Sequence, residues 1–96
     1  MTSAGTFETD SRLATLSKAL GNPVRLAIVR YLQAQRGERP CGAIVAQLPL
    51  AQSSVSRHLR VLCRAGLVES RAAPPSVRYR LRPGAVEEFR RLAATL

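Results

Sequence analysis

The sequence is poor in the residues on which large cores and disulfide-stapled scaffolds depend. Its 96 residues include two tyrosines, two phenylalanines, two cysteines, one histidine and no tryptophan. Two cysteines cannot supply the disulfide framework of a small secreted domain, which favours a reducing, cytoplasmic compartment. Acids are also scarce, since six stand against fifteen basic residues and the net charge is +9 at pH 7. So large an excess of positive charge in a short chain points to an anionic partner.

Long apolar runs are missing as well. No stretch is apolar enough to span a bilayer, and residues 1–10 lack the basic and apolar regions of a secretory signal, so no membrane association is expected. The length corresponds to one domain. Residues 1–10 are small and polar apart from Phe7 and are predicted to form a flexible tail. Residues 11–96 are predicted to form the folded domain.

Apolar periodicity predicts a mainly α-helical domain with a small β-hairpin. The expected helices span residues 11–20, 23–35, 43–48, 52–65 and 85–96. Pro49 cannot lie inside a continuous helix, so the third and fourth helices are predicted to meet at a sharp turn. Residues 67–72 and 77–82 are expected to pair as strands, because the second segment alternates three apolar side chains with three arginines. This order is typical of a winged helix-turn-helix.

The helix expected over residues 52–65 has the strongest chemical signature. Short hydroxyl side chains allow a helix to approach DNA closely, glutamine pairs with adenine, and arginine binds guanine or phosphate. Any surface helix is polar on its outer face, but a helix that faces only water would normally include glutamate, and residues 43–66 contain no acid. The predicted DNA contacts on this helix are Gln52, Ser53, Ser54, Ser56, Arg57, His58 and Arg60.

The predicted wing has the same sign of charge. Residues 51–82 hold seven arginines and a single acid, Glu69. Arg71 and Arg78 are predicted to contact DNA phosphates. The alternative is a basic strand that only protects a sheet edge from pairing with other chains. The alternation places the three arginines of the second strand outward and its three apolar residues toward the core, namely Val77, Tyr79 and Leu81.

These segments together resemble the ArsR/SmtB family of bacterial winged-helix repressors over residues 11–96. The resemblance rests on LSKALGNPVRL at residues 16–26, SSVSRHLRVL at residues 53–62, AGLV at residues 65–68 and VRYRL at residues 77–81. It implies a homodimer built from the first and last helices, operator binding by the helix over residues 52–65, and release by an inducer. The apolar stripes of the first and last helices fit such an interface, but they would equally suit an ordinary core.

The metal sites known in that family are incomplete in this chain. Members that sense soft metals have a Cys-Val-Cys-Asp pattern where this sequence offers only one thiol, Cys41, and no aspartate. Members that sense zinc use Asp, His and Glu of the last helix, which here contains Glu87 and Glu88 but no histidine. No metal site within one chain and no cofactor is therefore predicted. Cys41, close to Arg39 at an expected helix start, is a candidate redox or inducer-sensing residue. Cys63 is expected to be a buried structural thiol.

Two functions follow from these patterns. The first is a dimeric transcriptional repressor whose recognition helices enter successive major grooves about 34 Å apart on a two-fold-symmetric operator. The second is a basic winged-helix protein-interaction module without sequence-specific DNA binding. Salt dependence and sequence preference distinguish the two. An enzyme is not predicted, because the sequence has no glycine-rich phosphate loop, no metal cluster and no nucleophile with a matching base.

Overall fold

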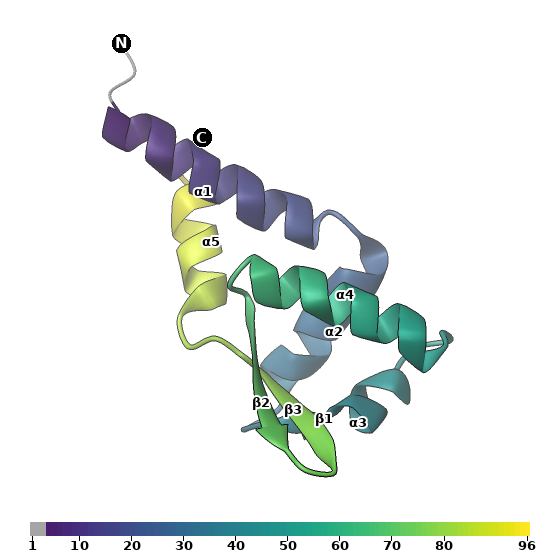
Figure 1. Cartoon of the computed structure of the whole chain (residues 1–96). Helices are drawn as coiled ribbons and strands as arrows, with labels where there is room; N and C mark the ends of the chain where they lie inside the picture. The colour runs from purple at the N-terminus through teal and green to yellow at the C-terminus, as the bar shows by residue number, and fades with distance from the viewer. Residues whose placement is uncertain (1–3) are drawn as a thin grey trace.

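The structure, a computed structural model that describes residues 4–96, combines five helices of that region with one small sheet (Figure 1). In chain order the elements are α1 (Ala4–Leu20), α2 (Pro23–Ala34), β1 (Arg39–Pro40), α3 (Cys41–Val45), α4 (Gln52–Arg64), β2 (Val68–Ala73), β3 (Ser76–Leu81) and α5 (Ala85–Ala93). The predicted mainly helical domain with a β-hairpin wing is confirmed.

Helix α1 begins earlier than the sequence predicted. Residues 4–10 of the predicted flexible tail are helical, and residues 1–3 of that tail lie outside the described part of the chain. No proline or glycine interrupts residues 6–20, so the helix continues toward the N-terminus without a break. Helix α1 therefore runs through the boundary predicted between a tail over residues 1–10 and a domain over residues 11–96.

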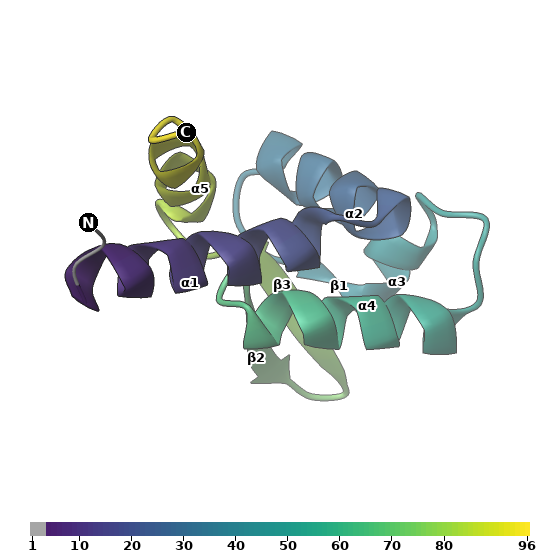
Figure 2. The same ribbon diagram turned by 90° about the horizontal axis from the view of Figure 1, so that it is seen from above.

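The turn from α1 into α2 follows from two adjacent residues. Asn22 is the N-cap, and its Oδ1 accepts hydrogen bonds from the backbone N–H of Val24 at 2.9 Å and of Arg25 at 3.2 Å. Pro23 occupies the first helical position, where its missing N–H leaves no bond unmade. The predicted start of α2 is thus confirmed. Seen from above, α1 extends beyond the part of the molecule formed by α2, α3 and α4 (Figure 2).

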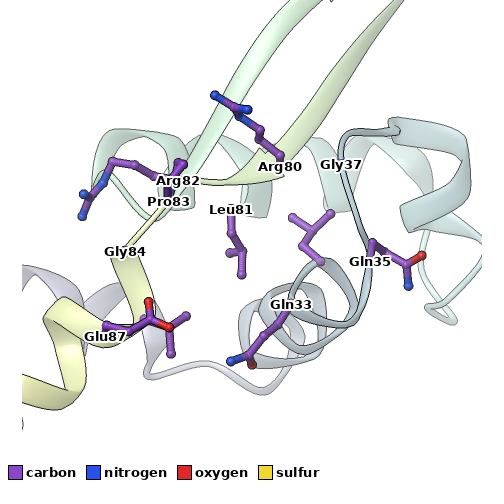
Figure 3. Close-up of a pocket in the computed structure, with 11 residues that line it drawn as sticks. Gln33, Gln35, Gly37, Arg80, Leu81, Arg82, Pro83, Gly84 and Glu87 are labelled. Carbon is purple, nitrogen blue, oxygen red and sulfur yellow. The ribbon is translucent and has the colours of Figure 1, made fainter.

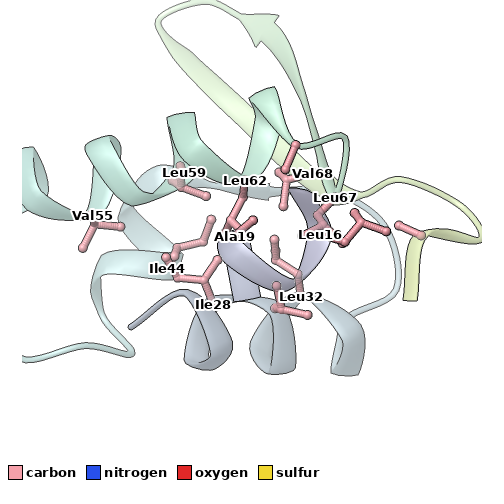
Figure 4. Packing of buried hydrophobic residues seen from close by; sticks show 13 residues of the cluster. Leu16, Ala19, Ile28, Leu32, Ile44, Val55, Leu59, Leu62, Leu67 and Val68 are labelled. Carbon is pink, nitrogen blue, oxygen red and sulfur yellow. The ribbon is translucent and has the colours of Figure 1, made fainter. Parts of the chain in front are cut away.

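One apolar core holds α4 against the other helices (Figure 4). Val55, Leu59 and Leu62 on the inner side of α4 are fully buried, as their spacing predicted. They pack with aliphatic residues of every other helix and of β2, and no aromatic side chain among residues 4–96 is fully buried. The core therefore fixes which side of α4 faces outward.

The sheet has the order β1–β3–β2, with all neighbours antiparallel. Strand β1 lies in a segment that the sequence predicts as a loop. The prediction missed this strand because two residues are too few to show an alternating pattern. Tyr79 and Leu81 of β3 are half-buried against the core, but Val77 is 39% exposed. The prediction that Val77 faces the core is wrong, because Val77 belongs to the last pair but one before the hairpin turn. The hairpin itself projects past the helices (Figure 1).

The ends of two helices also differ from the prediction. Helix α3 spans Cys41–Val45 rather than residues 43–48, and the chain then tightens into a turn in which Leu48 N–H bonds to the Val45 carbonyl at 3.0 Å. Helix α5 ends at Ala93, three residues before the predicted end. Such shifts are common at helix termini, where the last turn often tightens.

Candidate nucleic-acid interface

Helix α4 presents one exposed stripe opposite its buried side. The members of the stripe are Ser53, Arg57, Arg60 and Arg64, separated by four, three and four residues. Gln52 is also exposed, at the first position of the helix. The three arginines form no salt bridge with any residue of the described range 4–96. They give α4 an outward row of guanidinium groups, which match phosphate oxygens and guanine edges.

The other predicted contacts on α4 lie on its two flanks. Ser56 is half-buried, with its Oγ 3.9 Å from the Sγ of Cys41 at the start of α3. His58 is half-buried on the side of α2, where its Nδ1 lies 3.2 Å from the Nη1 of Arg25. Ser54, half-buried as well, lines a shallow hollow together with His58. The predicted set therefore wraps around α4 rather than forming one face. Each assignment to DNA stays a prediction.

Arg64 is missing from the predicted contacts, although it continues the exposed stripe by one more turn. Its spacing of seven residues from Arg57 was a usable signal in the sequence, since residues seven apart lie on the same side of a helix.

The surroundings of His58 favour its neutral form. Burial, and then the charges of Arg25 and Arg57, lower the pKa of His58. A guanidinium has only donors, so Arg25 bonds to His58 when Nδ1 is unprotonated and accepts. Under that assignment the ring carries its hydrogen on Nε2 and offers it as a donor.

Two arginines of the wing, Arg71 and Arg80, are paired with carboxylates. Arg71 donates from Nε to Glu38 Oε2 at 2.8 Å and from Nη2 to Glu38 Oε1 at 2.6 Å. Arg80 donates from Nε to Glu69 Oε2 at 3.0 Å. The hydrogen bonds from Arg71 are the main cause that lowers the pKa of Glu38. Arg71 stays a predicted phosphate contact, but it must exchange a carboxylate for the phosphate.

Arg78 on β3 and Arg82 just after it differ in whether they have a partner among the described residues. Arg78 is half-buried and forms no salt bridge within residues 4–96, so it keeps its charge available for the predicted DNA contact. Arg82 was expected to face outward. Instead it turns back, donating from Nε to the Gly66 carbonyl at 2.6 Å and from Nη2 to Glu88.

Neither Cys41 nor Cys63 forms a disulfide, and both are half-buried. Burial raises the pKa of the Cys63 thiol, with a hydrogen bond to Ser70 acting in the opposite direction. Cys63 packs against the core but is less buried than predicted. Cys41 as a sensing residue stays a prediction. Within residues 4–96, no group of three or more His, Cys, Asp or Glu side chains is placed to hold a metal ion.

A separate hollow of about 320 Å³ lies between the end of α2, the base of the wing and the start of α5 (Figure 3). Two of its charged lining residues, Arg80 and Arg82, are engaged by Glu69 and Glu88. None of the α4 stripe lines it. None of the helices in the described part of the chain is sufficiently long and apolar to cross a membrane.

Comparison with known proteins matches both the sequence and the shape of this arrangement. The helix-turn-helix domain family matches residues 20–71, more than half of the chain. A solved winged helix-turn-helix DNA-binding domain from Mycobacterium bovis, described as homodimeric and as a possible ArsR-family regulator, superposes with a TM-score of 0.75. Its sequence identity is 32%, and the match covers 97% of this chain and 82% of that domain. The chain belongs to the ArsR/SmtB family.

Two sequence relatives agree with this assignment. An uncharacterised helix-turn-helix transcriptional regulator of Methanocaldococcus jannaschii is 35% identical over 65 residues, which are 68% of this chain and 72% of that regulator. The transcriptional repressor SmtB of Mycobacterium tuberculosis is 41% identical over 66 residues, which are 69% of this chain and 47% of the repressor. The ArsR/SmtB chain described here thus matches about half the length of the mycobacterial repressor. Both relatives are named as transcriptional regulators.

Proposed function

We propose that this ArsR/SmtB-family protein is a homodimeric transcriptional repressor that binds a two-fold-symmetric operator through α4. The observation that carries the proposal is the exposed stripe of α4, where Arg57, Arg60 and Arg64 have no carboxylate partner within residues 4–96. Guanidinium groups that neutralise DNA phosphates release the counterions condensed on the DNA. This release is a main source of affinity for DNA. Ser53 and Gln52, exposed at the start of the same helix, suit contacts with base edges.

The end of the molecule formed by α1 and α5 supports the homodimer. Phe7 on α1 is 67% exposed, and Leu96 just beyond α5 is 97% exposed. Large apolar side chains at one end of a small domain are typical of an interface with another chain. Leu16 and Ala19 of α1 belong to the core, so only part of the predicted stripe is available for a second subunit. A two-fold dimer repeats α4 symmetrically, which requires a symmetric operator.

Release of the operator is proposed to act through Cys41. Its Sγ lies 3.9 Å from the Oγ of Ser56 on α4, so a chemical change at the thiol reaches the flank of the DNA-binding helix. Hydrogen peroxide oxidises a cysteine thiol to sulfenic acid and is itself reduced to water. We expect peroxide to weaken operator binding by the wild type and the Cys41→Ser variant to bind equally before and after treatment. An identical response of both proteins would exclude Cys41.

Fluorescence anisotropy with the reduced protein tests the main proposal. The probes are duplex DNA from upstream of the protein's own gene and a scrambled duplex of equal composition, over a series of salt concentrations. Tight, sequence-selective binding with a steep salt dependence is expected. Weak binding that is equal on both duplexes would contradict a repressor and favour a basic module that binds acidic proteins.

A matched pair of variants assigns the binding to α4. Arg57→Ala and Arg91→Ala remove the same charge from exposed positions, one on the α4 stripe and one on α5. Arg57→Ala is expected to reduce operator affinity by about 1–3 kcal/mol, and Arg91→Ala to have a much smaller effect. Equal losses would indicate that only the overall charge matters.

A further inference from the structure

We propose that Glu88 of α5 is a positioning residue that fixes the direction of α4 relative to α1 and α5, and thereby the half-site spacing that the dimer accepts. The inference rests on the proposed function, and its three charged residues, Arg12, Arg82 and Glu88, lie outside the matched range 20–71. The carrying observation is a network in which one carboxylate holds two arginines against the end of α4.

The first arm of the network comes from α1. Arg12 donates from Nε to Glu88 Oε2 at 3.2 Å and from Nη2 to Glu88 Oε1 at 3.0 Å. Its remaining nitrogen, Nη1, donates to the carbonyl oxygen of Ala65 at 2.8 Å. Ala65 directly follows the last residue of α4. One planar guanidinium therefore joins α1, α5 and the end of α4.

The second arm comes from the end of β3. Arg82 donates from Nη2 to Glu88 Oε1 and from Nε to the Gly66 carbonyl at 2.6 Å. Carbonyl groups at the C-terminal end of a helix lack helical donors, and this end is the negative end of the helix dipole. Two cations at this position thus satisfy two carbonyls and stabilise the C-terminal end of α4, while Glu88 holds both cations in place.

Gly66 shows how closely the parts fit. Its φ is +77°, a conformation that favours glycine, and an added Cβ would lie 3.2 Å from the Nη2 of Arg12. The backbone of the chain can turn here and still let Arg12 approach the end of α4. A Cβ at this position would require the guanidinium of Arg12 to shift by a few tenths of an ångström.

The charges of the network depend on one another. Hydrogen bonds from Arg12 are the main cause that lowers the pKa of Glu88, and those from Arg82 act in the same direction. The side chains of Arg12 and Arg82 are each 33% exposed, and that of Glu88 is 23% exposed. Without the carboxylate, two partly buried guanidinium groups would share one site with no counter-charge, so they would move apart.

This arrangement has a consequence for a dimer joined through α1 and α5. How far the distance between the two copies of α4 can vary then depends on how rigidly each α4 is attached to those helices. Glu88 supplies that attachment at the C-terminal end of α4, whereas the apolar core supplies it along the inner face. Loss of Glu88 should loosen the direction of α4 more than it loosens the fold.

The test compares Glu88→Gln with Glu87→Gln. Both variants raise the net charge by one on adjacent residues of α5, but Glu87 is exposed and forms no salt bridge within residues 4–96. Anisotropy measures affinity for the operator footprinted with the wild type and for versions with one base pair added or removed between the half-sites. The preference is the ratio of the affinity for native spacing to the affinity for altered spacing. We expect Glu87→Gln to keep the wild-type ratio and Glu88→Gln to reduce it about tenfold.

A second variant keeps the test decisive if Glu88→Gln does not fold. Arg82→Lys retains the net charge and the carboxylate but cannot bridge Gly66 and Glu88 with one planar group. It is expected to reduce the preference for native spacing in the same direction. Wild-type spacing preference in Glu88→Gln, or in Arg82→Lys where the first variant is unfolded, would overturn the proposal.

Amide hydrogen exchange separates this inference from the proposed function. Glu88→Gln should speed exchange at residues 63–67, at the end of α4, relative to Glu87→Gln, with or without DNA. A wild type that binds no operator would contradict the repressor, but exchange would still report on Glu88. Equal exchange in both variants would show that Glu88 does not hold α4, whatever the protein binds.

Discussion

Helix α4 and the β2–β3 wing have the same sign of charge, but the fold treats them differently. The arginines of the α4 stripe have no carboxylate partner within residues 4–96, whereas Arg71 pairs with Glu38 and Arg80 with Glu69. A paired guanidinium must give up its carboxylate before it can neutralise a phosphate. The comparison teaches that the number of basic residues overstates the capacity of the wing to bind DNA. Helix α4 offers charge that is already available.

The largest expected effect comes from removing the support on which α4 rests. Leu59 is fully buried at the centre of its inner face, so Leu59→Ala should lower the free energy of unfolding by about 2–5 kcal/mol. Val61 on the same helix is 38% exposed, and Val61→Ala should change it by less than about 0.5 kcal/mol. Urea denaturation followed by circular dichroism measures both. Similar losses in the two variants would contradict the placement of the buried face.

The next prediction compares an available arginine with a paired one. Arg64→Ala should weaken DNA binding by about 1 kcal/mol or more and reduce the slope of log affinity against log salt by about 1. Arg80→Ala should reduce the slope by less, because Glu69 already offsets the charge of Arg80. Salt titrations with the same duplex give both slopes. If the two slopes fall equally, pairing within the wing does not limit its contact with DNA.

Much of α4 could be predicted from the sequence, because the residues that determine its buried side lie close together along the chain. The spacing of Val55, Leu59 and Leu62 determines the buried side, and a helix then leaves the opposite side exposed. The capped start of α2 at Asn22 is local in the same sense. Patterns of this kind need no knowledge of distant parts of the chain.

Two ion pairs, one in the wing and one on α5, could not be predicted, because each joins residues that are far apart in the sequence. Glu38 lies 33 residues before Arg71, and Arg12 lies 76 residues before Glu88. Alternation in a strand shows which side chains share a face, but not which carboxylate a loop brings to that face. For the same reason the alternation wrongly predicts that Arg82 faces outward. In the structure Arg82 turns back to bond with the Gly66 carbonyl and Glu88.

A smaller effect should follow from releasing the wing. Glu38→Gln removes the carboxylate that holds Arg71, so DNA affinity should rise severalfold and the salt slope should become steeper by about 1. Glu87→Gln serves as the control, since it adds the same net charge at an exposed position on α5 where Glu87 forms no salt bridge within residues 4–96. An equal gain in the two variants would mean that only the total charge has changed.

The smallest effect concerns His58, which is half-buried on the flank of α4 beside the exposed stripe. Its pKa is lowered by burial, by Arg25 and by Arg57. Between the folded pKa and the ordinary value of 6.5 the unfolded chain binds more protons, so the free energy of unfolding should fall as the pH drops through that window. Below the folded pKa the contribution is fully lost and no longer changes.

Because His58 is the only histidine, its ring signals can be followed by NMR without assignment of the whole chain. Arg25→Met should raise the pKa of His58 more than Arg57→Met does, since Arg25 contacts Nδ1 directly at 3.2 Å. A pKa at or above 6.5 in the wild type would contradict the neutral donor form. The outcome decides whether α4 offers only permanent charge to DNA, or also one donor whose charge changes with pH.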